Sequence, residues 1–116
     1  MKKKSRQQSL KRRHEFRYYN RMSINKRGKM IRYRHPAYVF LEKGNLYIFV
    51  TITHSETIPN QLVVKLRKNP NPLDGKDAFY VADIREDTKD RFRKRLSNWR
   101  IDNSDDLDIQ KLYKKR

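Results

Sequence analysis

The sequence predicts an α+β fold, in which a small, strongly curved antiparallel sheet or small barrel is followed by helices. Three observations predict it: β-rich runs within residues 37–84, helical apolar spacing from residue 88 onward, and a basic segment that precedes both. The chain has 116 residues, the size of one domain, and 35% of them are hydrophobic, too few for a thick core. We therefore expect a β-rich domain with two C-terminal helices, residues 35–116, behind a basic arm, residues 1–34.

The predicted arm carries most of the positive charge. Residues 1–34 hold 14 of the 30 lysines and arginines and one of the 13 acids, Glu15, so the other 16 bases and 12 acids lie in residues 35–116. Sparse apolar residues and like-charge repulsion predict an arm that is disordered in isolation, with a transient helix over residues 8–22. Deleting residues 1–33 is then expected to leave a folded domain.

Four strands are expected in the domain. Residues 37–41 and 46–53 flank a Glu-Lys-Gly-Asn turn and predict a hairpin whose second strand is covered on both faces. Residues 61–67 and 78–84 predict the third and fourth strands. They are separated by a loop, residues 68–75, which contains two prolines and a glycine.

Two helices are expected after the strands. The side chains of Thr88, Phe92, Leu96 and Trp99 recur at helical spacing and form one apolar stripe, which predicts the first helix. In residues 102–115 the aspartates come early and the lysines late. That order complements the helix dipole and predicts the second helix.

Composition excludes several classes of protein. The chain has no cysteine, which excludes disulfides, iron–sulfur clusters, a thiolate zinc site and a cysteine nucleophile. No apolar run reaches the roughly 18 residues of a membrane span, and none follows the basic N-terminus as in a secretory signal. The net charge of +17 indicates a polyanionic partner, and we expect a cytoplasmic protein.

The arm predicts a nucleic-acid interface, because lysine and arginine neutralise phosphates while interleaved aromatic rings stack on unpaired bases. Arginine-rich segments commonly become ordered when they bind RNA, so the composition of the arm favours RNA over DNA. The lysines and arginines after residue 64 are expected to extend the phosphate-binding surface of the arm. The alternative is that they form a solvated, charged surface. The predicted nucleic-acid-binding residues are Lys11, Arg12, Arg13, Arg17, Tyr18, Tyr19, Arg21, Lys26, Arg27, Arg32, Lys65, Arg67, Lys68, Arg91, Lys94 and Arg95.

Two histidines, His35 and His54, flank the predicted hairpin and should lie near one another at one end of it. Such a pair could act as general base and acid on an RNA 2′-hydroxyl and its leaving group. The alternative is a pair of strand-end histidines bonded to the backbone. Two histidines without a carboxylate at ligand spacing make a poor metal site, so we expect no metal and no cofactor.

The segments RHPAYVF, residues 34–40, and ITHS, residues 52–55, resemble the core of the MazF/PemK-type toxin endoribonucleases. The resemblance implies an SH3-like barrel with a C-terminal helix, which cuts single-stranded RNA without a metal. In the family the arginine adjoins the proline, whereas here His35 separates Arg34 from Pro36. Arg34 would stabilise phosphate charge and Thr53 would line the scissile site, so the catalytic candidates are Arg34, His35, Thr53 and His54.

Three functions stay open at this point. The first is a nucleic-acid-binding protein, with RNA preferred, from a phage or another mobile element. The second is a metal-independent endoribonuclease, which would lose activity but not affinity when His35 and His54 are changed. The third is an inhibitor or accessory factor that docks on a ribonucleoprotein, such as an RNA-guided nuclease (as some anti-CRISPR proteins do) or the ribosome. Such a factor would require the assembled complex.

Overall fold

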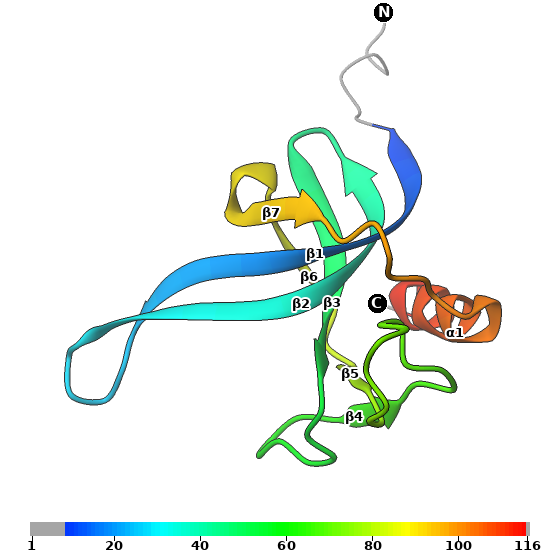
Figure 1. The fold of residues 1–116 in the computed structure, drawn as a ribbon. Helices are drawn as coiled ribbons and strands as arrows, with labels where there is room; N and C mark the ends of the chain where they lie inside the picture. The colour runs from blue at the N-terminus through cyan, green and yellow to red at the C-terminus, as the bar shows by residue number, and fades with distance from the viewer. Residues whose placement is uncertain (1–8, 116) are drawn as a thin grey trace, which may run out of the picture.

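The computed structural model describes residues 9–115 as a mostly antiparallel sheet followed by one helix (Figure 1). The strands run in the order β4-β5-β3-β2-β1-β7, and β6 also pairs with β3. The elements are β1 (Leu10–Ile24), β2 (Met30–Lys43), β3 (Leu46–Thr53), β4 (Val63–Lys65), β5 (Phe79–Val81), β6 (Arg85–Thr88), the 3₁₀ turn η2 (Lys89–Arg91), β7 (Phe92–Arg95) and α1 (Asn103–Lys114). No helix in the described part of the chain has the length and hydropathy needed to cross a bilayer.

The prediction of a disordered arm with a transient helix over residues 8–22 is wrong for the residues described. Instead, β1 pairs with β2 from Leu10 opposite Lys43 to Ile24 opposite Met30, with a bulge between Arg12 and Glu15. The physical reason is that β2 needs a strand on each edge, because its run from residue 37 to residue 42 is buried. Residues 1–8 of the predicted arm lie outside the described residues.

The predicted domain boundary after residue 34 falls within β2. Phe16 and Tyr19, both in the predicted arm, are 1% and 3% exposed and belong to the core. Deleting residues 1–33 would therefore remove core side chains. Truncating a buried phenylalanine alone costs about 3–5 kcal/mol. The deletion is consequently expected to unfold the protein rather than to test binding.

The predicted hairpin is confirmed as β2–β3, and its second strand is covered on both faces. On one face Ile48, Val50 and Ile52 pack in a cluster that includes Phe16 and Ile109 of α1. On the other face Tyr47 and Phe49 pack in a second cluster with Tyr19, Ala37, Val39 and Phe92. The third and fourth predicted strands are confirmed as the shorter strands β4 and β5.

The first predicted helix is wrong, whereas the second is confirmed. Residues 88–99 form the end of β6, η2, β7 and a turn, because the open edges of two strands offer hydrogen bonds: β6 pairs with β3, and β7 pairs with β1. Phe92 still enters the core in the cluster with Tyr47 and Phe49, and Leu96 and Trp99 pack against the other cluster, which contains Phe16. The helix α1 is capped by the Asp102 side chain, which accepts from the backbone N–H of Ser104 and Asp105.

The outer parts of β1 and β2 continue past the sheet as a two-stranded projection, residues 20–34, called the ribbon below (Figure 1). Pairing with β7 ends at Tyr19, and pairing with β3 ends at Ala37. In the connecting turn Asn25 Oδ1 accepts from the N–H of Arg27 at 2.9 Å and of Lys29 at 3.0 Å. Gly28 has φ 77°, a left-handed conformation that glycine adopts without strain.

Candidate nucleic-acid interface

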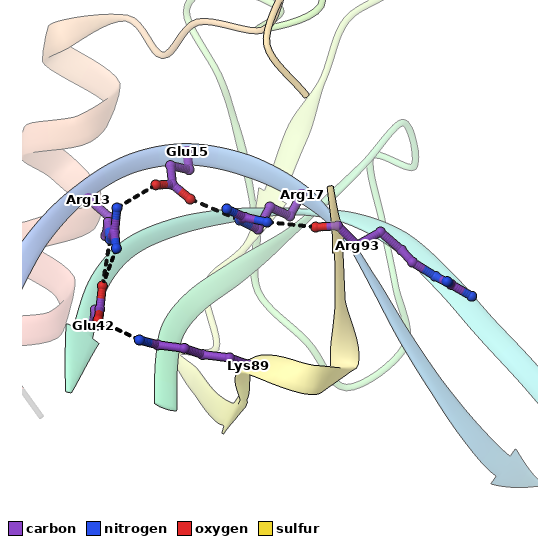
Figure 2. Close-up of polar contacts among 6 residues, drawn as sticks. All are labelled: Arg13, Glu15, Arg17, Glu42, Lys89 and Arg93. Carbon is purple, nitrogen blue, oxygen red and sulfur yellow. Dashed lines mark hydrogen bonds and ion pairs between the residues drawn. The ribbon is translucent and has the colours of Figure 1, made fainter. Parts of the chain in front are cut away.

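Two buried carboxylates hold cations on the body of the protein. Glu15 and Glu42 are 5% and 8% exposed. Arg13 donates to Glu42 Oε1 from Nε at 2.6 Å and to Glu15 Oε2 at 2.8 Å. Lys89 Nζ lies 2.5 Å from Glu42 Oε2, and Arg17 Nε lies 2.9 Å from Glu15 Oε1. Figure 2 shows this network, in which Arg17 also donates to the backbone carbonyl of Arg93.

The network explains the pKa shifts of Glu42 and Arg13. The hydrogen bond from Lys89, followed by that from Arg13, lowers the pKa of Glu42 below its ordinary value despite burial. The same contact raises the pKa of Arg13. The predicted nucleic-acid residues Arg13 and Arg17 therefore have carboxylate partners, which join β1 to β2 and η2, and Arg17 joins β1 to β7 through the Arg93 carbonyl.

Aspartates at the start of α1 hold a second group of cations. Asp105 accepts from the Arg67 backbone N–H at 3.0 and 3.1 Å and from its guanidinium at 3.2 Å, and Asp108 accepts from that guanidinium at 2.8 Å. Asp106 accepts from the Tyr38 hydroxyl at 2.5 Å and from Arg12 at 3.3 Å. Burial, followed by the Asp106 hydrogen bond, raises the pKa of Tyr38.

The ribbon, in contrast, carries cations without acids. Residues 20–34 contain six lysines and arginines, and no aspartate or glutamate occurs from residue 16 to residue 41. Lys26, Arg27, Lys29 and Arg32 are exposed, and their side chains make no ion pair or hydrogen bond with any residue from 9 to 115. Arg21 belongs to the ribbon by its backbone pairing with Tyr33. Arg34 stacks over the Tyr18 ring at 5.0 Å.

The structure brings only some of the predicted nucleic-acid residues together. Arg21, Lys26, Arg27 and Arg32 lie on the ribbon. Lys94 and Arg95 lie on the exposed edge strand β7 rather than on a helix, and Arg91 lies 3.5 Å from Asp87. Lys65, 3.4 Å from Asp77, and Lys68 lie with Arg67 in or after β4. Lys11 is exposed near the start of β1.

The expectation that Tyr19 stacks on a base is wrong, because Tyr19 is buried and donates its hydroxyl to Asp87. Its ring lies 4.7 Å from that of Phe49 and 5.0 Å from that of Phe92. Sequence reasoning missed Lys29, although the acid-free run around it was a usable signal. It also missed Arg85, for which no local pattern gave a signal.

A cleft of about 310 Å³ lies where the ribbon leaves the sheet. Ala37 pairs with Thr51, so alternation along the strands places His35 and Thr53 on this same face, and both line the cleft. Arg34, one residue away, does not line it, so the candidates Arg34 and Thr53 are not brought together. The cleft is lined by Tyr19, His35, Thr51, Ile52, Thr53, Ile58, Gln61, Val81 and Arg85.

His35 and His54 lie near one another as expected, since both line an adjoining cavity of about 280 Å³. However, His54 Nε2 lies 3.0 Å from Asp74 Oδ2, and Nδ1 lies 3.0 Å from the Asp77 carbonyl oxygen. Both ring nitrogens of His54 therefore face acceptor atoms of the protein. The geometry of His54 fits the alternative of a strand-end histidine bonded to the backbone.

Comparison with known proteins gives no relative of this chain. No family model, no curated protein and no solved structure matches it. The functional argument therefore depends on the charges and geometry described above.

We predict that Glu42→Gln lowers the free energy of unfolding by about 1–2 kcal/mol near neutral pH, because the hydrogen bonds from Arg13 and Lys89 lose a charged acceptor. The pKa of Glu42 is lowered in the folded protein, so its stabilisation is complete above the ordinary value and is lost as the pH falls through the lowered one. Urea unfolding at several pH values should show the variant and the wild type converging in acid.

A suitable control is Glu56→Gln, which removes an exposed carboxylate without an ion pair in the described part of the chain. This variant should unfold like the wild type at each pH. Parallel stability profiles for Glu42→Gln and the wild type would contradict the account of the network.

Proposed function

We propose that this protein binds nucleic acid, RNA in preference to DNA, through the ribbon. The single observation that carries the proposal is the separation of charge. Arg13, Arg17 and Arg67 of the body have carboxylate partners, whereas the ribbon sequence contains six lysines and arginines and no acid. A cation without a carboxylate partner gives up no ion pair when it contacts a phosphate. Each such contact adds to the binding free energy by releasing counterions from the polyanion.

The shape of the ribbon supports the same proposal. Its two strands are paired along their length and joined by a turn that Asn25 organises, so the cations are presented on a preformed element. A preformed element loses less conformational entropy on binding than a disordered arm does. The preference for RNA is supported by the resemblance of residues 34–55 to RNA-cutting toxins.

The test is the variant Lys26→Gln/Arg27→Gln/Lys29→Gln/Arg32→Gln. We expect it to weaken binding to single-stranded RNA by about tenfold or more at moderate salt. The slope of log affinity against log salt should fall by about three, because each lost phosphate contact removes a little less than one unit. Fluorescence anisotropy over a series of salt concentrations measures both quantities.

The matched control is Lys43→Gln/Lys111→Gln/Lys114→Gln/Lys115→Gln, which removes the same charge from exposed lysines outside the ribbon. Equal losses in both variants would show that net charge alone drives binding and would contradict the proposal. Binding to an assembled ribonucleoprotein but not to naked RNA would favour the docking factor instead.

A second candidate function is metal-independent RNA cleavage in the cleft beside the ribbon. One observation favours it: His35, Thr53 and Arg85 line a single cleft. We infer that the sheet is an SH3-like barrel, since β6 and β7 follow one another in the chain and pair with β3 and β1. In such a cleft Arg85, rather than Arg34, would stabilise the phosphate charge.

Cleavage is tested with labelled single-stranded RNA incubated in EDTA. If the cleft cuts RNA, wild-type protein should shorten it, while Thr53→Ala should bind it equally well and leave it intact. Arg85→Gln should also leave it intact and should lose no more affinity than one phosphate contact contributes. His54→Ala is expected to cleave, since both ring nitrogens of His54 are already occupied. RNA that stays intact with the wild type would rule out the second function and leave the first untouched.

A further inference from the structure

The outer half of the ribbon combines its cations with exposed apolar side chains. Met22, Ile24 and Met30 are 46%, 66% and 58% exposed. Ile24 pairs directly with Met30, and Met22 pairs directly with Arg32. Directly paired residues, and residues two apart on one strand, point to the same face of a ribbon. These three apolar side chains therefore form one face with Arg32, called the apolar face below.

The apolar face lies between cations on both sides. Lys26 and Arg27 are in the turn beyond it, and Arg34 lies behind it, nearer the sheet. A second copy of this chain is a poor occupant, because two ribbons without acids would repel one another. The occupant has to be anionic and also present apolar surface.

Unpaired nucleotides have this combination of properties, because each has a backbone phosphate and its base exposes a flat face when it is unstacked. A continuous RNA duplex does not: its bases are stacked, and its major groove is too deep and narrow for side chains to read. We propose that the apolar face packs against unpaired bases, so that the ribbon selects loops, bulges and single strands over continuous duplex RNA. This inference rests on the proposed function and specifies its substrate class.

The test compares two RNAs of equal phosphate number, one with a large loop and one fully paired. We expect Met22→Thr/Ile24→Thr/Met30→Thr to bind the looped RNA about tenfold more weakly, since contacts to bases are lost. Binding to the duplex and the salt dependence should not change, because every cation is kept. Threonine preserves the strand conformation, and circular dichroism checks that the fold is intact.

The matched control is Leu62→Thr/Leu73→Thr/Leu107→Thr, which removes side chains that are 68%, 88% and 56% exposed elsewhere on the surface. It should bind both RNAs like the wild type. Unchanged binding of the looped RNA by the ribbon variant, or equal losses on both RNAs, would overturn the inference. If the charge variant loses RNA binding and the apolar variant does not, the inference is overturned and the proposed function is retained.

A parallel measurement with anionic phospholipid vesicles separates a lipid surface from nucleic acid. The inference expects weak binding that the apolar substitutions do not alter. Tight vesicle binding that these substitutions abolish, with no preference for the looped RNA, would overturn it and assign the apolar face to a membrane surface.

Discussion

Pairing of body cations with buried carboxylates is the constraint on which the rest of this structure depends. Glu15 and Glu42 are almost inaccessible, and between them they hold Arg13, Arg17 and Lys89. Leaving either carboxylate buried without these donors would cost several kcal/mol, on the order of a large share of the stability of a small domain. The cations are thus part of the fold, and they join β1 and β2 to η2.

The aspartates of α1 have the same effect on the opposite side of the sheet. Asp105 and Asp106 are 2% and 6% exposed, and they attach the helix to Arg67, Tyr38 and Arg12. Other cations of the body, such as Lys43, Lys94 and Lys111, are exposed without a carboxylate partner among residues 9–115, but acids lie among them, whereas the ribbon contains no acid. Because β1 and β2 run without a break from core to ribbon, the ribbon is continuous with the folded body, and the cleft lies at their junction.

The parts of the fold that sequence reasoning predicted are those with a local signal. The hairpin of β2 and β3 has continuous β-rich runs around a turn, and α1 has its cap and dipole pattern within one segment. In contrast, Phe16 and Tyr19 lie in a basic segment with few apolar residues, and they form a strand because β2 needs a partner on that edge. The helical spacing of Phe92, Leu96 and Trp99 is equally well satisfied by a strand and a turn that pack on the sheet.

The candidate site was predictable in charge but not in arrangement. The excess of lysine and arginine predicted a polyanionic partner from composition alone, yet composition could not distinguish a disordered arm from a paired ribbon. A shift of one residue along β2 also changes which side chain lines the cleft. Because strand side chains alternate, His35 lines the cleft where Arg34 was expected, and Arg34 lies over the Tyr18 ring. Arg85 reaches the same cleft through the pairing of β6 with β3, a contact between residues far apart in the sequence.

The most direct measurement of the central claim is a titration of ¹⁵N-labelled protein with single-stranded RNA, followed by the backbone amide resonances. If the ribbon is the interface, the largest shift changes should fall on residues 20–34, and they should continue toward Thr53 only if RNA enters the cleft. Changes concentrated on β7 and α1, with the ribbon amides unmoved, would contradict the account.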